Sequence, residues 1–125
     1  MASNKNPAKK ESAIKKVHAR FYLTPAGGNP VRDWLMEQTP EDKRQLGYDV
    51  GVVELGWPIG MPVCKNLGDG LWEIRSNLSS GRIARVLFCI RRGELMLLHG
   101  FIKKTQKTPK PDLDLAIKRQ KEVSS

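Results

Sequence analysis

The sequence has few of the residues on which metal centres, disulfide frameworks and membrane anchors depend. It contains two histidines and two cysteines, and Cys64 and Cys89 are too far apart for a CxxC motif. Without a Cys/His array or an acidic cluster, we expect neither a metal site nor a cofactor. No apolar run approaches the roughly 18 residues of a membrane span, and the N-terminal lysines precede no apolar signal core. These absences favour a cytoplasmic protein with both cysteines as small buried hydrophobes.

The usual signatures of nucleic-acid-binding modules are missing as well. There is no zinc-finger spacing, no aromatic-rich strand of the RNA-recognition type and no glycine-rich phosphate loop followed by Lys-Ser/Thr. With 125 residues, of which 39% are hydrophobic and 28% charged, the chain fits one ordinary globular domain. Any binding of a nucleic acid would therefore depend on the charge displayed by that domain.

The whole chain has a net charge of +9, and its positive charge is concentrated in two segments. Residues 1–20 contain six basic residues and one acidic, residues 65–110 contain ten and three, and residues 21–64 contain three and six. The first excess lies in a stretch with little to bury, so residues 1–15 are interpreted as a basic flexible extension of a single domain at residues 16–125. The second excess alternates with apolar residues, which indicates a polyanion-binding face on folded structure.

The first half of the domain predicts one strand and two helices. Residues 16–23 alternate weakly between apolar and polar side chains, as in a strand. Asn29 and Thr39 are N-cap residues, each followed by proline, and predict a short helix and then a longer one. Gly47 and Gly51 within the longer helix each cost roughly 1 kcal/mol relative to alanine. We therefore expect a close packing contact at these glycines, as in a tight helical hairpin.

The second half predicts four strands and a final helix. The four β-prone runs cover residues 63–67, 71–78, 82–91 and 94–103, and they are separated by the short glycine-containing turns GDG, SSG and RG. A Thr-Pro-Lys-Pro sequence follows, and then a segment with early aspartates and late basic residues, as in a helix. The fold class expected is a small α+β single domain, in which two N-terminal helices and a C-terminal helix pack on an antiparallel meander.

Strand alternation predicts which side chains share the polar face of this sheet. In the last strand, His99 is expected to lie opposite Met96 and Leu98. The polar face is expected to carry Arg75, Arg85, His99 and Lys103. Arginine suits a phosphate ligand because its planar fork donates two parallel, charge-assisted hydrogen bonds, and RNA is the natural ligand of such a face.

Each of these side chains also has a structural interpretation. An arginine of the sheet could form a cross-strand ion pair, in the case of Arg75 with Glu73 or Glu94. His99 could be a half-buried residue that satisfies a backbone carbonyl. The lysines of residues 103–110 could form a solvated basic end. The sequence leaves these alternatives open.

Cleavage of RNA by such residues would not need a metal ion. The ribose 2′-OH of the RNA serves as the nucleophile, so the protein has to supply a base for its proton, cations for the crowded phosphate and an acid for the leaving oxygen. Arginines, lysines and one histidine can provide these groups.

Three segments resemble the RelE/HigB toxins of bacterial and phage toxin–antitoxin pairs, and the HigB-like branch in particular. They are KNLGDGLWEIR at residues 65–75, RIARVLF at 82–88 and LLHGFIKKTQKTP at 97–109. The resemblance extends over about residues 17–122 and implies a RelE-like fold. It implies a ribosome-dependent endonuclease that cuts mRNA in the ribosomal A site, where the ribosome and its RNA serve as the scaffold. It also implies a cognate helix-turn-helix antitoxin, through which alone the protein would reach operator DNA.

The resemblance also implies roles for individual residues. Arg75 and Arg85 match family positions that contact or stabilise the scissile phosphate. Lys103 and Lys104 match the cationic segment after the last strand, and His99 lies where a HigB-like proton-transfer residue could act. Further contacts to the substrate are expected from Lys65, Arg82, Lys107 and Lys110.

The general base and the class of target are the points that the sequence leaves open. Some RelE members use a tyrosine near the C-terminus, whereas Tyr22 and Tyr48 lie far upstream. A ParE-like inhibitor of DNA gyrase would share the fold without needing catalytic cations, and a non-catalytic nucleic-acid-binding module would only neutralise phosphates. Trp34, Trp57 and the last helix are candidate antitoxin contacts, with core packing as the alternative for the tryptophans.

Overall fold

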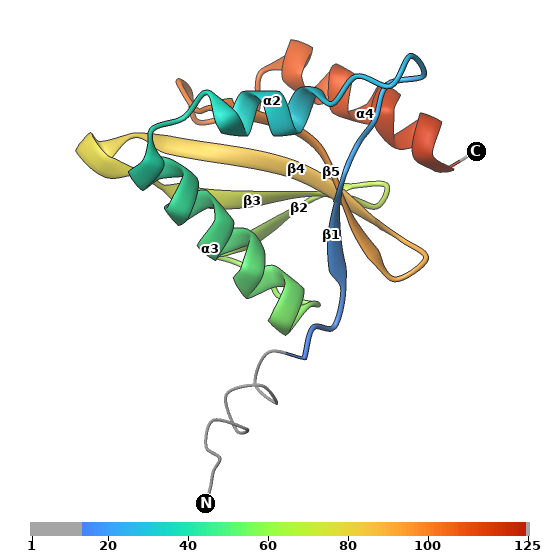
Figure 1. Cartoon of the computed structure of the whole chain (residues 1–125), viewed down its shortest axis with the longest axis horizontal. Coiled ribbons are helices and arrows are strands. Elements are labelled where there is room, and N and C mark those ends of the chain that lie inside the picture. The colour runs from blue at the N-terminus through green and yellow to red at the C-terminus, as the bar shows by residue number, and fades with distance from the viewer. Residues whose placement is uncertain (1–13, 125) are drawn as a thin grey trace, which may run out of the picture.

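The computed structural model describes residues 14–124, so most of the predicted extension, residues 1–13, lies outside the described part. Three helices and a five-stranded sheet form a small α+β domain, as predicted (Figure 1). In chain order the elements are β1 (His18–Phe21), α2 (Pro30–Met36), α3 (Pro40–Gly56), β2 (Cys64–Gly68), β3 (Leu71–Asn77), the 3-10 turn η1 (Ser79–Gly81), β4 (Ile83–Arg91), β5 (Glu94–Ile102) and α4 (Lys110–Ser124).

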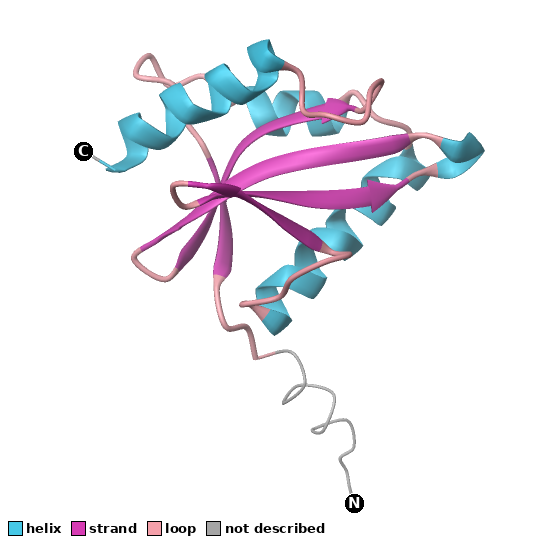
Figure 2. Ribbon diagram, turned by 180° about the vertical axis from the view of Figure 1, so that it is seen from behind, coloured by secondary structure: helices cyan, strands magenta, loops and turns pink. Residues whose placement is uncertain are grey.

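The strands are arranged in the order β1-β5-β4-β3-β2, and the sheet is strongly twisted (Figure 2). Strands β2 to β5 form the predicted antiparallel meander. Strand β1 adds to the β5 edge in parallel, with His18 opposite Glu94 and Phe21 opposite Leu97. Alternation within β1 carries no information about its partner, so this pairing was not predicted.

The two faces of the sheet carry separate hydrophobic clusters. Ile74, Val86 and Phe88 belong to the cluster that also contains buried residues of α2 and α3. Leu87, which alternates with Val86 and Phe88 in β4, belongs to the second cluster, together with Ala116 of α4. Helix α4 packs on β4 and β5, as predicted for the C-terminal helix. Within residues 14–124, no helix is long and apolar enough to cross a membrane.

The two predicted helix starts are confirmed, although only one of them is capped by a side chain. Helix α3 begins after Thr39, whose side-chain oxygen accepts a hydrogen bond from the Asp42 backbone N–H at 3.2 Å. Helix α2 begins at Pro30 after Asn29, but the Asn29 side chain makes no capping bond. Proline at the first helical position therefore marks the start of α2 without side-chain capping.

The predicted packing contact at Gly47 and Gly51 is wrong. A Cβ atom placed at either glycine would meet nothing within 4 Å. Helix α2 packs on β5 and α3 packs on β3, instead of forming a tight hairpin with each other. The close approach occurs at Gly100 of β5, where a Cβ would lie 2.5 Å from ring carbons of Trp34. Trp34 thus lies against the sheet at a place where only glycine leaves room for it.

The same substitution is therefore expected to have opposite effects at two glycines. Gly51→Ala should stabilise the protein by up to about 1 kcal/mol, because alanine favours the helix and nothing obstructs its methyl group. Gly100→Ala should destabilise it by about 1–3 kcal/mol, because the methyl group displaces the Trp34 ring. Urea unfolding followed by circular dichroism measures both changes. Equal destabilisation by the two variants would contradict this account.

A β-bulge changes the predicted alternation of β5. Leu87 pairs with His99 and Phe88 pairs with Leu97, which leaves Leu98 as the extra residue. Leu98 and Met96 consequently pack in the same cluster as Phe101. The prediction that they lie opposite His99 is wrong, because a strict period of two does not allow for an extra residue.

The other two tryptophans pack against each other within the first cluster. Trp57, at the end of α3, meets Trp72 edge to face with ring centroids 5.0 Å apart, and meets Phe88 in the same manner at 5.5 Å. These contacts agree with the core-packing interpretation of Trp57.

Candidate functional site: a cationic pocket across four strands

A pocket of about 200 Å³ opens on the sheet, and successive strands contribute its charged side chains. Lys65 comes from β2, Glu73 and Arg75 from β3, Arg85 from β4, and Lys103 from the residue directly after β5. Met61, Pro62, Val63 and Gln106 complete the lining. Four cations thus surround one carboxylate, so the pocket has a strong excess of positive charge and favours an anionic ligand.

The register of the sheet brings these residues together. Lys65 is the cross-strand partner of Glu73, and Arg75 is the partner of Arg85. The end of β5 is fixed by the Lys103 backbone N–H, which donates to the Ile83 carbonyl at 2.7 Å. Two arginines directly opposite each other repel, so their juxtaposition is unfavourable for the free protein. An anion bound between them would relieve this repulsion.

Arg85 is held in the floor of the pocket by a buried ion pair. Its Nη1 donates to Glu73 Oε1 at 2.5 Å, and the exposed fractions of the two residues are 6% and 2%. The second carboxylate oxygen, Glu73 Oε2, accepts from the Thr108 hydroxyl at 2.7 Å. Arg85 Nε is buried and has no hydrogen-bond partner among the described residues. Glu73 therefore orients the Arg85 guanidinium without using all of its donors.

Arg75 is exposed and has neither of the ion pairs that the sequence offered. Glu73 is bound to Arg85, and Glu94 is bound to Arg20 Nε at 2.8 Å. The contact recorded for Arg75 is a long one of 3.5 Å from its Nε to Asn77 Oδ1. Its guanidinium is thus available to a ligand at the pocket rim.

The pocket changes the acidity of Lys103. Loss of hydration lowers the pKa of its amine, and the positive charges of Arg85 and Arg75 lower it further. The negative charge of Glu73 acts in the opposite direction but is outweighed. Because its pKa is lowered, Lys103 has a larger neutral fraction at a given pH than an ordinary lysine. A neutral amine can accept a proton.

His99 does not line the cationic pocket. Its Nε2 lies 2.6 Å from Asp112 Oδ1, and its ring stacks on Phe101 with centroids 5.6 Å apart. Asp112 belongs to the first turn of α4. The contact therefore links β5 to α4, and a catalytic role of His99 stays a prediction.

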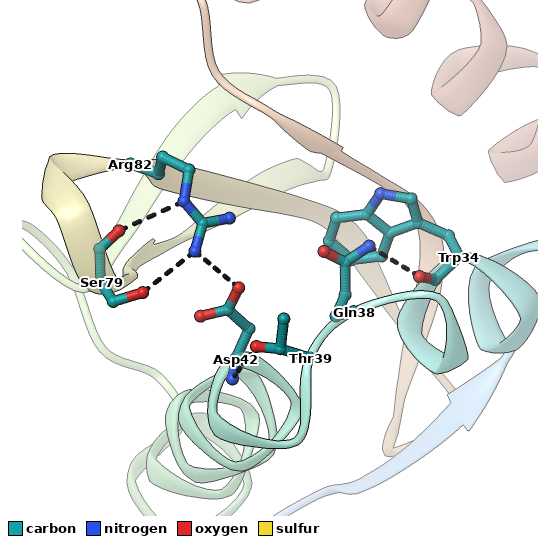
Figure 3. Close-up of polar contacts among 6 residues, drawn as sticks. All are labelled: Trp34, Gln38, Thr39, Asp42, Ser79 and Arg82. Atoms are coloured by element: carbon teal, nitrogen blue, oxygen red, sulfur yellow. Dashed lines mark hydrogen bonds and ion pairs between the residues drawn. The ribbon is translucent and has the colours of Figure 1, made fainter.

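The remaining predicted cations lie around the pocket or have partners of their own. Arg82 donates from Nη2 to Asp42 Oδ2 at 2.7 Å and also contacts Ser79, which connects the start of β4 to α3 (Figure 3). Lys110 pairs with Asp114 at 2.8 Å. Lys104 lines a hollow next to the pocket, with Arg82 and Lys103. Lys107 is exposed, and its backbone carbonyl accepts from Thr105.

Glu73 and Thr108 are the site residues that sequence reasoning missed. The sequence offers Glu73 only as a partner of Arg75, although its position two residues before Arg75 places both on one face of the strand. Thr108 carries no sequence signal of this kind, because the loop between β5 and α4 brings it to Glu73. Within residues 14–124, no group of three or more His, Cys, Asp or Glu side chains is placed to hold a metal ion.

The fold and the pocket define a small α+β domain that displays an arginine- and lysine-lined site on a mostly antiparallel sheet. Sequence comparison identifies which domain this is. The chain belongs to the family described as Phage derived protein Gp49-like (DUF891), whose family model matches residues 33–121 and so includes all the charged residues of the pocket. This family is part of the RelE/ParE-type toxin superfamily, which implies a cognate antitoxin. A search of curated proteins found no match.

Proposed function

We propose that the protein is a HigB-like, ribosome-dependent mRNA endonuclease that inhibits translation by cutting mRNA in the ribosomal A site. The observation that carries this proposal is the pocket in which Lys65, Arg75, Arg85 and Lys103 surround Glu73. A toxin that acts only by contact with another protein has no need for opposed arginines and a lysine of lowered pKa in one pocket. Membership of the Gp49-like family, which is part of a toxin superfamily, also supports the proposal that the protein is a toxin.

The two arginines are suited to different parts of the reaction. Arg85 is buried and oriented by Glu73, so it presents a fixed positive charge to the scissile phosphate. Arg75 is exposed and can bind the same phosphate from β3, the strand next to the one that carries Arg85. Negative charge builds up on the phosphate oxygens in the transition state, and prearranged guanidinium groups stabilise it there more than in the ground state.

Lys103 is the proposed acceptor of the ribose 2′-OH proton. As the proton moves to its neutral amine, the 2′ oxygen attacks phosphorus and the bond to the 5′ oxygen breaks, which leaves a 2′,3′-cyclic phosphate. Lys65 lies at the other end of the row of cations, and its ammonium group can protonate the departing oxygen. This arrangement requires neither a metal ion nor a C-terminal tyrosine.

The role of Lys103 predicts a particular dependence of cleavage on pH. In the wild type, the single-turnover rate should rise with pH and level off below the range in which an ordinary lysine loses its proton, because the Lys103 pKa is lowered. Lys103→Arg keeps the charge but cannot accept a proton. This variant should lose activity by about 100-fold or more, and the rising limb with it. An unchanged pH profile in Lys103→Arg would assign the base elsewhere.

Programmed ribosomes provide the test of the whole proposal. Purified protein should cut mRNA within translated codons when the codon occupies the A site, and should leave the same mRNA whole without ribosomes. Intact mRNA on ribosomes would defeat the proposal. Inhibition of gyrase supercoiling by that protein would instead support a ParE-like toxin. Salt-sensitive binding without strand cleavage would support a non-catalytic module. The partner implied by the family is proposed to be a helix-turn-helix antitoxin.

A further inference from the structure

A second hollow, of about 450 Å³, adjoins the cationic pocket and shares Pro62, Val63 and Arg75 with it. It lies where α3 packs on β3. Its other lining side chains are Gln45, Tyr48, Asp49, Val52 and Asn77. Because Arg75 belongs to both hollows, a ligand with its phosphate in the cationic pocket can extend directly into this second one.

Tyr48 gives the hollow an aromatic wall that the rest of the protein leaves uncovered. The side chain is 69% exposed, so it contributes little to the core. Tyrosine has a flat apolar ring and a polar tip, and its exposed ring can stack on another π-system. The sequence placed Tyr48 far from the predicted site, but the packing of α3 on β3 brings it beside Arg75.

The polar groups of the hollow distinguish it from the cationic pocket. Gln45 Nε2 donates to both carboxylate oxygens of Asp49, at 3.2 and 3.1 Å, and the Ser76 hydroxyl donates to Asp49 Oδ2. Asp49 is thereby held in place as an acceptor. A fixed carboxylate repels a phosphate but accepts hydrogen bonds from the N–H groups of a nucleobase edge. Phosphate is therefore favoured at the Arg75 end and a base at the Tyr48 end.

We propose that this hollow is a nucleobase subsite. The base of a nucleotide adjacent to the scissile phosphate stacks on Tyr48, its N–H edge faces Asp49, and Arg75 bridges from the base subsite to the phosphate. The assignment of the ligand as RNA rests on the proposed function. An aromatic wall with an acceptor at one end and cations at the other matches the polarity of a nucleotide, and this match favours RNA over a protein segment.

The test combines variants of the full-length protein with RNA that lacks a single base. Tyr48→Ala should weaken binding of a short fluorescent single-stranded RNA, and slow cleavage on programmed ribosomes, by about 10- to 100-fold, whereas Tyr48→Phe should retain both. With the wild-type protein, RNA that has an abasic nucleotide at one position beside the cleavage site should be bound more weakly and cleaved more slowly by the same factor. It should lose nothing further with Tyr48→Ala, because the stacking partner is already gone. Leu55→Ala, an exposed position on the same helix, is the matched control.

The outcomes separate this inference from the nuclease proposal. If mRNA stays whole on ribosomes but RNA binding falls both in Tyr48→Ala and with the abasic RNA, the nuclease proposal fails and the subsite stands. If the wild type cuts mRNA and Tyr48→Ala cuts it equally well, the subsite fails and the nuclease stands. Independent, additive losses from the variant and the abasic RNA overturn the subsite. The subsite is also overturned if the wild type binds and cleaves abasic RNA as well as intact RNA. It is overturned as well if Tyr48→Ala loses antitoxin binding but neither RNA binding nor cleavage.

Discussion

Arg85→Ala is expected to lose about 3–5 kcal/mol of its free energy of unfolding and to lose mRNA cleavage as well. Glu73 is only 2% exposed, and Arg85 is its charged partner in the buried pair. Removal of the guanidinium leaves a largely buried carboxylate without its ion-pair partner, although the Thr108 hydroxyl still donates to it. Urea unfolding and the ribosome cleavage assay measure the two losses.

A double substitution separates the structural role of Arg85 from its proposed role in cleavage. Replacement of both partners, as in Arg85→Met with Glu73→Leu, should recover much of the lost stability, because a buried ion pair can be replaced by apolar side chains at little net cost. Cleavage should not return, since the fixed positive charge is gone. If the double variant were as unstable as Arg85→Ala, the cause of the instability would lie outside the unpaired carboxylate. If it cleaved mRNA, Arg85 would not be part of the site.

Local sequence patterns were sufficient to predict the order of the elements and to place Arg75 and Arg85 on the same face of the sheet. Proline after an N-cap residue marked both N-terminal helices, and turn residues separated the strands of the meander. Alternation placed Arg75 and Arg85 on the same face, and the antiparallel pairing of β3 and β4 sets them opposite each other. These features depend on neighbouring residues in the chain.

The features that escaped prediction depend on contacts between distant segments. The extra residue Leu98 is recognised only through the pairing of β5 with β4. Gly100 is required by Trp34, 66 residues upstream, whereas a Cβ at Gly47 or Gly51 of α3 would meet open space. The burial of Arg85 likewise depends on Glu73 and on Thr108 in a later loop. Alternation placed Arg85 on the polar face of the sheet, but its pairing with Glu73 depends on the fold.

Arg75→Ala should show the opposite balance of effects from Arg85→Ala. We expect cleavage to fall by about ten- to a hundred-fold, which corresponds to the loss of one charge-assisted contact of roughly 1.5–3 kcal/mol. Stability should hardly change, because Arg75 is exposed and both candidate carboxylates are bound to other arginines. Arg32→Ala is a matched control, since Arg32 is an exposed arginine of α2. Full cleavage by Arg75→Ala would remove Arg75 from the site.

The pH profile of the same variant tests the proposed base as well as the proposed phosphate contact. The positive charge of Arg75 is one of the causes that lower the Lys103 pKa. Its removal should raise that pKa and move the rising limb of the rate profile to higher pH, in addition to lowering the plateau. Arg75→Lys should keep the position of the limb, because the charge remains, and still lose rate, because the bidentate fork is gone. A lower plateau without movement of the limb in Arg75→Ala would mean that the base is not the amine beside Arg75.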